Sequence, residues 1–419
     1  MKELICSTIE RNVVLKCIRD HKRLDCRTID ETRSVNIEFR SHPGYVSVTL
    51  GQTRVIAQAS CRITKPKESR ASEGHIRIHL DMSKIPLINL ENWKHQEFVQ
   101  ELNGILEQNI RNSNCLDLES LCINSGELVW SIKIDLIVLN NCGNILDCAN
   151  IAALCSLYHF RLPEVSVHGS EIRVYSSTER RAHPLRILHF PINVLFAFFV
   201  DGRYTLIDPN SDEERLMDGF VSISMNQHKE ICGIHMGGKL GLKKEQVELC
   251  KKLAFKKVLE LTDRIRQANI TNILEKLWKK FYHIALILSK ENSPYHTDID
   301  YQNIFNILDE LKTETRKTIE IIKRSLLASR PILLSRDQLE DYIKRIEFAN
   351  EIMLNLDYLV KMTFDTYINF INIHWETNDN FESIEKQRII SEKYDMSMTR
   401  WQFILSKIER FHEVVKNCT

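Results

Sequence analysis

The stretch SVNIEFRSHPGYVSVTLGQTRVIAQASC, residues 34–61, decides the fold of the first part of the chain. It contains three runs rich in β-branched and aromatic residues, which favour strands. The turn-forming pairs Pro43-Gly44 and Gly51-Gln52 separate these runs. We therefore predict a meander of three strands, at 34–40, 45–50 and 53–61.

The segments after the meander alternate between strand and helix patterns. From His75 the sequence HIRIHLDM alternates with a period of two, as a half-buried strand does. Apolar residues then recur at steps of three and four from Val99 to Ile110, which predicts an amphipathic helix ending near Asn112. A long strand is predicted at 127–140 and a buried, mostly apolar helix at 147–160. Residues 30–160 therefore read as β-β-β-β-α-β-α, an α+β arrangement.

The pattern then starts again. Strands are predicted for VSVHG, EIRVYS, NVLFAFFVDGRYTLIDP and GFVSISMN, with a hairpin turn at Gly202, before a long helix from about Lys243 to Arg266. We therefore predict a second α+β half of similar plan to the first.

Composition divides the chain near residue 245. All 13 glycines lie at or before Gly241, and only one of the 12 cysteines, Cys418, follows Cys250. From 275 onward apolar residues stand at helical spacing among Lys and Glu, which predicts an antiparallel array of about four helices. The predicted domains are a helical segment at 1–29, two α+β halves at 30–162 and 163–270, and an all-α extension of unknown role at 271–419.

Charge and hydropathy exclude some classes of protein. A net charge of +1 excludes a histone-like polycation, so a nucleic acid would have to bind a local basic patch. The charged N-terminus lacks the apolar centre of a signal peptide, and no apolar run reaches the roughly 18 residues that span a bilayer. We expect a soluble intracellular protein without membrane contact, with free cysteines because no CxxC pair is present.

Two groups of charged residues are candidates for chemistry. Paired carboxylates on a loop at a strand end suit magnesium-assisted phosphoryl chemistry, although a solvated loop helped by Arg215 explains the same spacing. Basic residues after the third strand and at the end of the amphipathic helix could neutralise phosphates, although without other information the residues favour a solvated run of charges. The acidic group is Asp208, Asp212, Glu213, Glu214 and Asp218, and the basic group is Arg62, Lys65, Lys67, Arg70 and Arg111.

Two weaker motifs are set aside. His228 and Cys232 could bind a metal from one helix, but no further pair of ligands lies near them in the sequence. Gly237-Gly238-Lys239 lacks the frame of a phosphate-binding loop, so we predict a turn before a helix.

Several strings of the sequence together resemble the RNase PH superfamily. Within it, they are most similar to the eukaryotic RNA exosome core-ring subunits of the polymyositis/scleroderma autoantigen type. The likeness covers about residues 1–270. The strings are KRLDCR (22–27), GQTRVIAQASC (51–61), RASEG (70–74), RNSNCLDLESLCI (111–123), IDPNSDEERLMDG (207–219) and MNQHKEIC (225–232).

The resemblance implies an RNase PH-like fold and a place in a protein assembly. Six RNase PH-like subunits form a ring of three heterodimers in that family, capped by three S1/KH subunits and joined by a hydrolytic ribonuclease. Single-stranded RNA passes through the ring during rRNA maturation and mRNA turnover. We therefore expect these partners, and a location in the nucleus, nucleolus and cytoplasm.

The resemblance also implies that the chain is not an enzyme. Active relatives degrade RNA from its 3′ end with inorganic phosphate and a metal. A catalytic Asp of these relatives is Phe220 here, and a second functional Asp is Glu214. Their phosphate-gripping Arg is Asp147, whose carboxylate would repel phosphate. A phenyl ring can neither bind magnesium nor transfer a proton, so we expect no catalytic residue, metal or cofactor.

The resemblance also indicates which residues contact RNA, and the chain departs from the family at two places. Arg111 matches a family Arg that contacts substrate phosphate, and Arg62, Lys65, Lys67 and Arg70 fall where ring subunits face the channel. Cys26 replaces a usual Gly, so the turn there must avoid a positive φ or tolerate it at some cost. The extension from 271 replaces an acidic tail, and is either a docking module or a fused gene product.

Two alternative functions remain open from the sequence. The first is a phosphorolytic 3′–5′ exoribonuclease that uses Asp208, Glu214 and Asp218. The second is a helical adaptor that binds proteins through residues 275–419.

Overall fold

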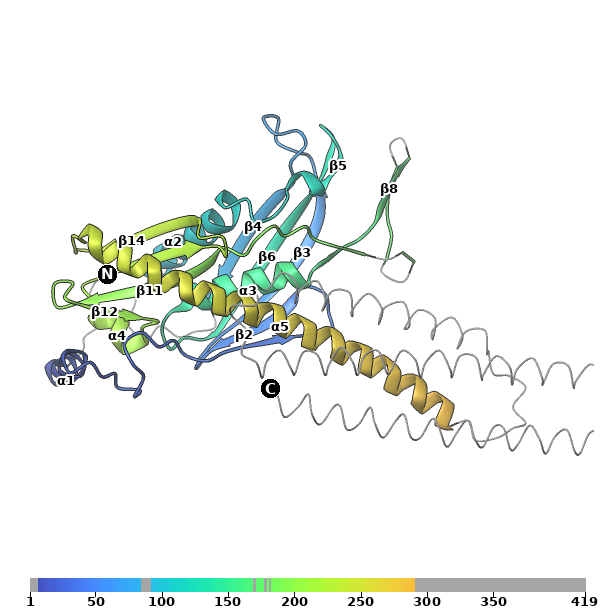
Figure 1. Cartoon of the computed structure of the whole chain (residues 1–419). Helices are drawn as coiled ribbons and strands as arrows, with labels where there is room; N and C mark the ends of the chain where they lie inside the picture. Colours follow the sequence, from blue (N-terminus) through green and yellow to red (C-terminus); the bar gives the residue numbers. More distant parts are fainter. Residues whose placement is uncertain (1–6, 84–91, 169–170, 177–178, 181, 291–419) are drawn as a thin grey trace, which may run out of the picture. The chain divides into compact units, whose positions relative to one another are not determined.

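The computed structural model describes residues 7–83, 92–168, 171–176, 179–180 and 182–290 (Figure 1). Contacts divide the chain into two compact units, Met1–Asn269 and Ile270–Thr419. The described part of the first unit contains two larger β-sheets, two short two-stranded pairs and the helices that cover the larger sheets. The predicted helices beyond residue 290, and the adaptor function that rests on them, lie outside the described residues.

The first sheet is the meander extended by three further strands. Its order is β1-β2-β3-β6-β4, and β5 pairs with the end of β6. All of these pairs are antiparallel except β4 with β6, which is parallel. The strands are β1 (Val35–Phe39), β2 (Tyr45–Leu50), β3 (Thr53–Thr64), β4 (His75–Asp81), β5 (Cys122–Asn124) and β6 (Leu128–Asn140).

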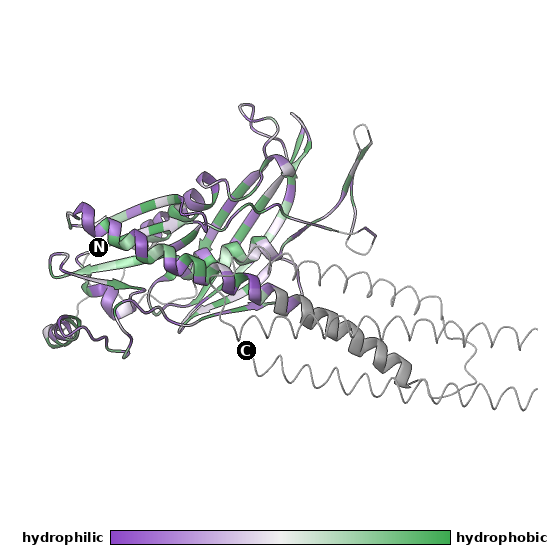
Figure 2. Ribbon diagram, viewed as in Figure 1, coloured by the Kyte–Doolittle hydropathy of each residue, from purple (hydrophilic) through white to green (hydrophobic). Residues whose placement is uncertain are grey.

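Helices cover one face of this sheet. Helix α2 (Asn92–Asn112) packs on β4, and α3 (Ile145–His159) packs on β2 and β3. The buried positions along β3 alternate with half-exposed ones, so one face meets the helices and the other is open. Figure 2 shows the same alternation of hydrophobic and hydrophilic residues along the strands. The predicted meander and both helices are confirmed; α3 begins two residues before the predicted start at 147, and α2 begins at Asn92, seven residues before Val99.

Helix α3 lies between the two sheets, because it also contacts β11 of the second sheet. Fourteen of its 15 residues are buried, which explains its nearly uniform apolar sequence. The short 3-10 helix η1 (Glu119–Leu121) precedes β5.

The second sheet has four strands in the order β12-β11-β13-β14, all antiparallel. Its strands are β11 (Ile192–Phe199), β12 (Tyr204–Ile207), β13 (Gly219–Met225) and β14 (Ile231–Gly238), and α4 (Ser211–Leu216) lies between β12 and β13. The predicted hairpin at Gly202 is confirmed, with φ at +78°. The core of the first unit draws on both sheets, α3 and α5.

The prediction of two α+β halves is confirmed, but two of the strands predicted for the second half lie outside its sheet. Strands β8 (Val165–His168) and β9 (Glu171–Val174) pair only with each other and form a separate hairpin that projects from the body (Figure 1). A further short pair, β7 (Arg161–Leu162) with β10 (His183–Pro184), precedes the second sheet. A two-residue or four-residue strand is too short for its pattern to show which sheet it joins.

Strand β14 was not predicted, and the turn expected at Gly237-Gly238 is wrong. Gly237 and Gly238 end this strand instead of forming the turn before the last helix. His228 lies in the β13–β14 turn and Cys232 in β14, so they do not share a helix. Glycine weakens the local strand signal, and pairing with β13 supplies the stabilisation that the segment lacks alone.

Two helices frame the first unit. Helix α1 (Thr8–Arg19) begins at a capping box of Ser7 and Glu10 and buries Val14 and Ile18 against Ala197, Phe199 and Leu206. Helix α5 (Lys244–Lys290) continues well beyond the predicted end near Arg266. No helix among the described residues is both long and apolar enough to cross a membrane.

Candidate functional site

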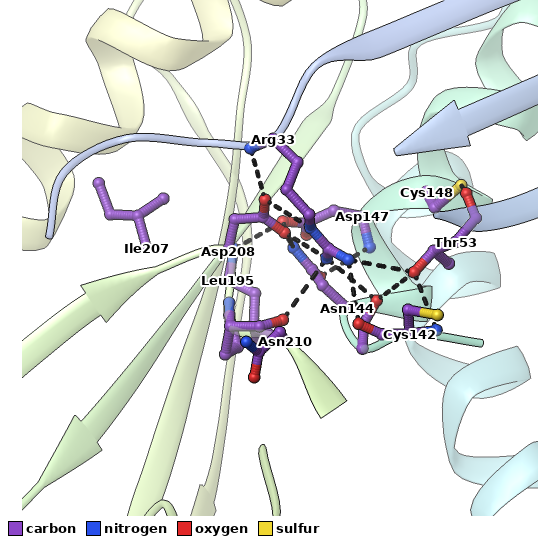
Figure 3. Close-up of polar contacts among 12 residues, drawn as sticks. Arg33, Thr53, Cys142, Asn144, Asp147, Cys148, Leu195, Ile207, Asp208 and Asn210 are labelled. Carbon is purple, nitrogen blue, oxygen red and sulfur yellow. Dashed lines mark hydrogen bonds and ion pairs between the residues drawn. The ribbon is translucent and has the colours of Figure 1, made fainter. Parts of the chain in front are cut away.

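A buried polar network joins the N-terminal segment, α3 and the second sheet, and Asp208 is its centre (Figure 3). The Asp208 carboxylate accepts from Arg33 Nη2 at 2.7 Å, from Arg27 Nη1 at 3.0 Å and from Asn144 Nδ2 at 2.8 Å. Burial alone would raise the pKa of Asp208, but the hydrogen bonds and charge of Arg33 outweigh burial and hold this pKa below its usual value. Asp208 is therefore an ionised carboxylate whose charge is already neutralised.

Arg33 also ties the network to the loop before α3. Its Nη1 donates to the carbonyl of Cys142 at 3.0 Å, and its Nη2 donates to the carbonyl of Gly143 at 3.1 Å. Thr53 Oγ1 donates to the same Gly143 carbonyl at 2.7 Å. The guanidinium is therefore fully engaged by Asp208 and by backbone carbonyls, and it is not available to hold a phosphate.

Asn144 and Asp147 form the first turn of α3. Asn144 has a left-handed backbone, with φ at 51°, and its side chain caps the helix by accepting from the Asp147 N–H. The Asp147 carboxylate accepts from Asn144 Nδ2 at 2.8 Å, from Asn193 Nδ2 at 2.6 Å and from the Leu195 N–H at 3.0 Å. Asp147 therefore fastens α3 to β11.

Glutamates of α4 close the network on its other side. A Glu214 carboxylate oxygen accepts from the Asn144 N–H at 2.6 Å. The carboxylate of the next residue along the chain toward the N-terminus, Glu213, accepts two hydrogen bonds from Arg23. One comes from Nε at 2.9 Å, and the other, which is shorter, comes from Nη2. Both Arg23 and Glu213 are buried. The acidic segment is therefore not a solvated loop: it forms a capped helix, and Glu213 of this helix pairs with the buried Arg23.

Two carboxyl groups in this network hold their protons unusually well. Burial raises the pKa of Asp147 to about 7, with a further contribution from the charge of Asp208. Burial likewise raises the pKa of Glu214 to about 7, and Asp208 and Asp147 add to the effect. Both groups therefore change charge near neutral pH.

These two pKa values predict how stability depends on pH. The unfolded values lie near 4, so the folded protein holds both protons more tightly. That contribution to the free energy of unfolding is present below about pH 4 and is lost as the pH rises through 7. Urea unfolding followed by circular dichroism should show stability falling from pH 5 to pH 8.

Variants on α4 test this assignment. Glu214→Gln should flatten the pH dependence, because the amide carbonyl can still accept from the Asn144 N–H but carries no titrating proton. The matched control Asp212→Asn lies on the same helix with an exposed side chain and should keep the original slope. Equal slopes in the wild type and Glu214→Gln would contradict the assignment.

The structure brings together only some of the predicted site residues. Asp147, Glu214 and Asp208 share the network, whereas Phe220 lies on β13 between Ala197 and Gly237, with its ring 5.7 Å from the ring of His235. Asp218 accepts from the Asp201 N–H instead of joining the network. Across the described residues, no group of three or more His, Cys, Asp or Glu side chains could hold a metal ion.

The predicted basic residues lie apart from this network. Arg62, Lys65, Lys67 and Arg70 are exposed at the end of β3 and in the loop after it, where Lys67 and Arg70 form an isolated bridge. Arg70 also pairs with Glu73 at 2.9 Å. Arg111 is exposed at the end of α2. All five side chains can be reached from solvent, and Arg70 is also engaged by Glu73.

Sequence reasoning missed Arg23, Arg33, Asn144 and Asn193. Arg23 and Arg27 stand in the string KRLDCR, so that string was the available signal, but their partners are 181 or more residues away. Cys26 within the string does adopt a positive φ, of 63°. The turn therefore tolerates the left-handed conformation that the usual Gly would adopt more easily.

Comparison with known proteins places this architecture in a family. The model of the 3′ exoribonuclease family matches with its domain 1 at residues 31–163 and with its domain 2 at residues 189–257. A solved archaeal structure described as the Archaeoglobus fulgidus exosome with RNA bound to the active site has a TM-score of 0.54 and 23% identity. That match covers 61% of this chain and 97% of the other, and it shows the fold.

Curated relatives are more similar in sequence. The human protein named exosome complex component RRP45 is 46% identical over 331 residues, which are 78% of this chain and 75% of the relative. The rat protein of the same name is 41% identical over the same length, and the Saccharomyces cerevisiae one is 32% identical over 305 residues, 98% of its length. The matches to the human and rat proteins cover 331 residues, which is more than the 269 residues of the first unit, so they continue past this unit.

With both RNase PH domains in order and these relatives covered over three quarters of their length, the chain belongs to the RNase PH-like family of RRP45 exosome components.

Proposed function

We propose that this chain is a non-catalytic core-ring subunit of an RNA exosome, supporting 3′–5′ RNA processing and decay through assembly and RNA guidance. The main support for a non-catalytic role is that Asp147 stands at the start of α3, where active relatives have an Arg that binds phosphate. Its carboxyl group is buried beside Asp208, and the nearby guanidinium of Arg33 is engaged by Asp208. Among the residues that the structure describes, a phosphate dianion at this place would meet carboxyl groups and no uncommitted cation.

Phe220 supports the same conclusion independently. Its side chain packs across β13 and β14, and a Cβ at Gly237 would lie only 2.4 Å from its ring. An aromatic ring in that place fills space and holds neither a metal nor a proton. The three carboxylates of the alternative, an exoribonuclease, already have partners. Asp208 pairs with Arg33, and Glu214 accepts from the N–H of Asn144 at the start of α3. Asp218 accepts from the N–H of Asp201.

The partners follow from the family. The relatives are named components of an exosome complex, which supports assembly of this chain with other RNase PH-like subunits into a ring, with S1/KH cap subunits and a hydrolytic ribonuclease. The exposed Arg62, Lys65, Lys67, Arg70 and Arg111 would grip the RNA backbone without reading its sequence. We also propose that the protein works in the nucleus, nucleolus and cytoplasm.

Charge reversal at Arg111 tests the RNA path. Arg111→Glu should weaken RNA protection by the assembled ring about tenfold at moderate salt, because one phosphate contact becomes a repulsion. Ring assembly should be unchanged, since Arg111 is exposed at a helix end. Nuclease protection of a single-stranded RNA, with Lys251→Glu on the exposed face of α5 as the control, gives the measurement. Equal protection by both variants would remove Arg111 from the RNA path.

A further inference from the structure

The basic loop between β3 and β4 ends in a tight turn beyond the end of the first sheet (Figure 1). The backbone N–H of Arg70 donates to the carbonyl of Lys67 at 2.9 Å, and the same two residues form an isolated β-bridge. Glu68 and Ser69 are therefore the two residues at the tip of the turn, and both are exposed. The tip presents a serine hydroxyl directly between two cationic residues.

The hydroxyl of Ser69 is available for modification. It forms no hydrogen bond with any residue that the structure describes. Ser72 in the same loop is also exposed, but the backbone beside it is held, because the Gly126 N–H donates to the carbonyl of Ala71 at 2.9 Å. Ser72 is also followed directly by a carboxylate, Glu73. Of the two serines, Ser69 therefore has the more accessible backbone and the more basic surroundings.

The charges around the tip nearly cancel. In residues 62–73 and the β5–β6 turn that contacts them, the cations exceed the carboxylates by one. The cations are Arg62, Lys65, Lys67 and Arg70, and the carboxylates are Glu68, Glu73 and Glu127. A phosphoserine carries a charge of about −1.5 to −2 at neutral pH. One phosphate is therefore enough to reverse the sign of this surface.

We propose that Ser69 is a phosphorylation site through which a serine/threonine kinase that accepts basic flanking residues weakens the hold of this loop on RNA. Lys65 and Lys67 stand four and two residues before Ser69, and Arg70 follows it. The inference rests on the proposed RNA path and assigns its regulation.

The modification is an ordinary phosphoryl transfer from ATP. The bond between the γ-phosphorus and the oxygen that bridges it to the β-phosphate breaks, and a new bond joins the γ-phosphorus to Ser69 Oγ. ADP leaves, and the hydroxyl proton passes to the catalytic base of the kinase.

The new phosphate acts in two ways on the loop. It repels the phosphates of an RNA backbone, and it offers acceptor oxygens to the neighbouring side chains of Lys67 and Arg70. Cations that pair with the phosphoserine are then not available to RNA. Both effects weaken binding of RNA of any sequence, because only backbone contacts are involved.

RNA protection by a ring with one defined phosphate tests the effect. The full chain is made with phosphoserine at position 69 and assembled with its RNase PH-like partners. Nuclease protection of a single-stranded RNA should be about tenfold weaker than with the unmodified ring at moderate salt, and the difference should shrink at high salt. The control carries phosphoserine at position 41, which is exposed in the β1–β2 connection and should change protection by less than about twofold. Equal protection by the two phosphorylated rings would overturn the proposal.

Mass spectrometry tests whether cells use the site. The native complex is purified from its source cells with phosphatase inhibitors and digested with chymotrypsin, because trypsin would cut at Lys67 and Arg70 on either side of Ser69. The expected result is a fraction of the chain with phosphate on Ser69. An unmodified Ser69, or phosphate on Ser72 alone, would overturn the assignment.

The outcomes separate this inference from the proposed function. If the unmodified ring protects RNA and the ring with phosphoserine at position 69 protects it equally well, the regulation is wrong while the RNA path stands. If the unmodified ring does not protect RNA, the proposed RNA path fails and this inference fails with it.

Discussion

Replacing Arg23 with methionine is expected to lower the free energy of unfolding of the first unit by about 3–5 kcal/mol. The Arg23 side chain is fully enclosed and donates to the carboxylate of Glu213. It also donates to the backbone carbonyls of Ile207 and Asp208, at 2.8 Å in both cases. Methionine has similar length but leaves Glu213 as a buried, unneutralised carboxylate. That loss, more than the loss of the contacts themselves, makes the effect large.

Hydrogen exchange measured peptide by peptide isolates the first unit from the rest of the chain. The slowest amides of β6 and β11 report its opening, and their exchange should accelerate by roughly two to three orders of magnitude in Arg23→Met. Arg19→Met, an exposed position on α1, should change these rates by less than a factor of about three. The double variant Arg23→Met/Glu213→Gln should recover part of the loss, because the buried charge is gone. Similar rates in Arg19→Met and Arg23→Met would show that the ion pair does not hold the unit together.

A methyl group at Gly143 is expected to destabilise the same unit by about 2–5 kcal/mol. Gly143 has φ at +94°, and a Cβ there would lie 2.4 Å from the carbonyl carbon of Asn210 and 2.5 Å from the Ser211 nitrogen. Both are backbone atoms at the start of α4, so neither can move aside as a flexible side chain could. The loop before α3 and the start of α4 would have to separate, which would disturb the contacts of Arg33 and Glu214 across them.

Gly126 offers a matched control for this variant. It also has a positive φ, of +82°, but a Cβ there would meet no atom within 4 Å. Gly126→Ala therefore measures the backbone strain alone, about 1 kcal/mol. The difference between the two variants measures the close approach of the α3 and α4 segments. Equal losses of stability, compared by thermal unfolding, would contradict the tight packing described for this network.

Periodicity predicted those parts of the fold where one face of an element is buried. The meander, the long strand β6 and the apolar α3 were predicted because alternation or uniform hydropathy extends over many residues. Strand β14 was missed because three of its eight residues are glycines, Gly233, Gly237 and Gly238. The sequence did not show that β8 and β9 form a separate hairpin, because each strand has only four residues.

The polar network could not be predicted from local pattern. Arg23 and Glu213 are 190 residues apart, and each stands among other charges that read as a solvated surface. The acidic segment 208–218 was recognised as unusual, yet whether it bound a metal, formed a loop or paired internally depended on which cations the fold brought to it. Asp147 and Phe220 were found only through the resemblance to the RNase PH superfamily, whereas Glu214 also stood in the acidic segment, and the roles of all the site residues stay predictions.

Phosphate-dependent degradation of a single-stranded RNA tests the central claim most directly. The purified full chain is assayed alone and assembled with its RNase PH-like partners, with the size of the complex measured in the same preparation. The account predicts a ring in which no release of nucleoside diphosphates is attributable to this chain, and in which Asp218→Asn changes nothing. Release of nucleoside diphosphates that Asp218→Asn abolishes would contradict it and show the chain to be a phosphorolytic exoribonuclease.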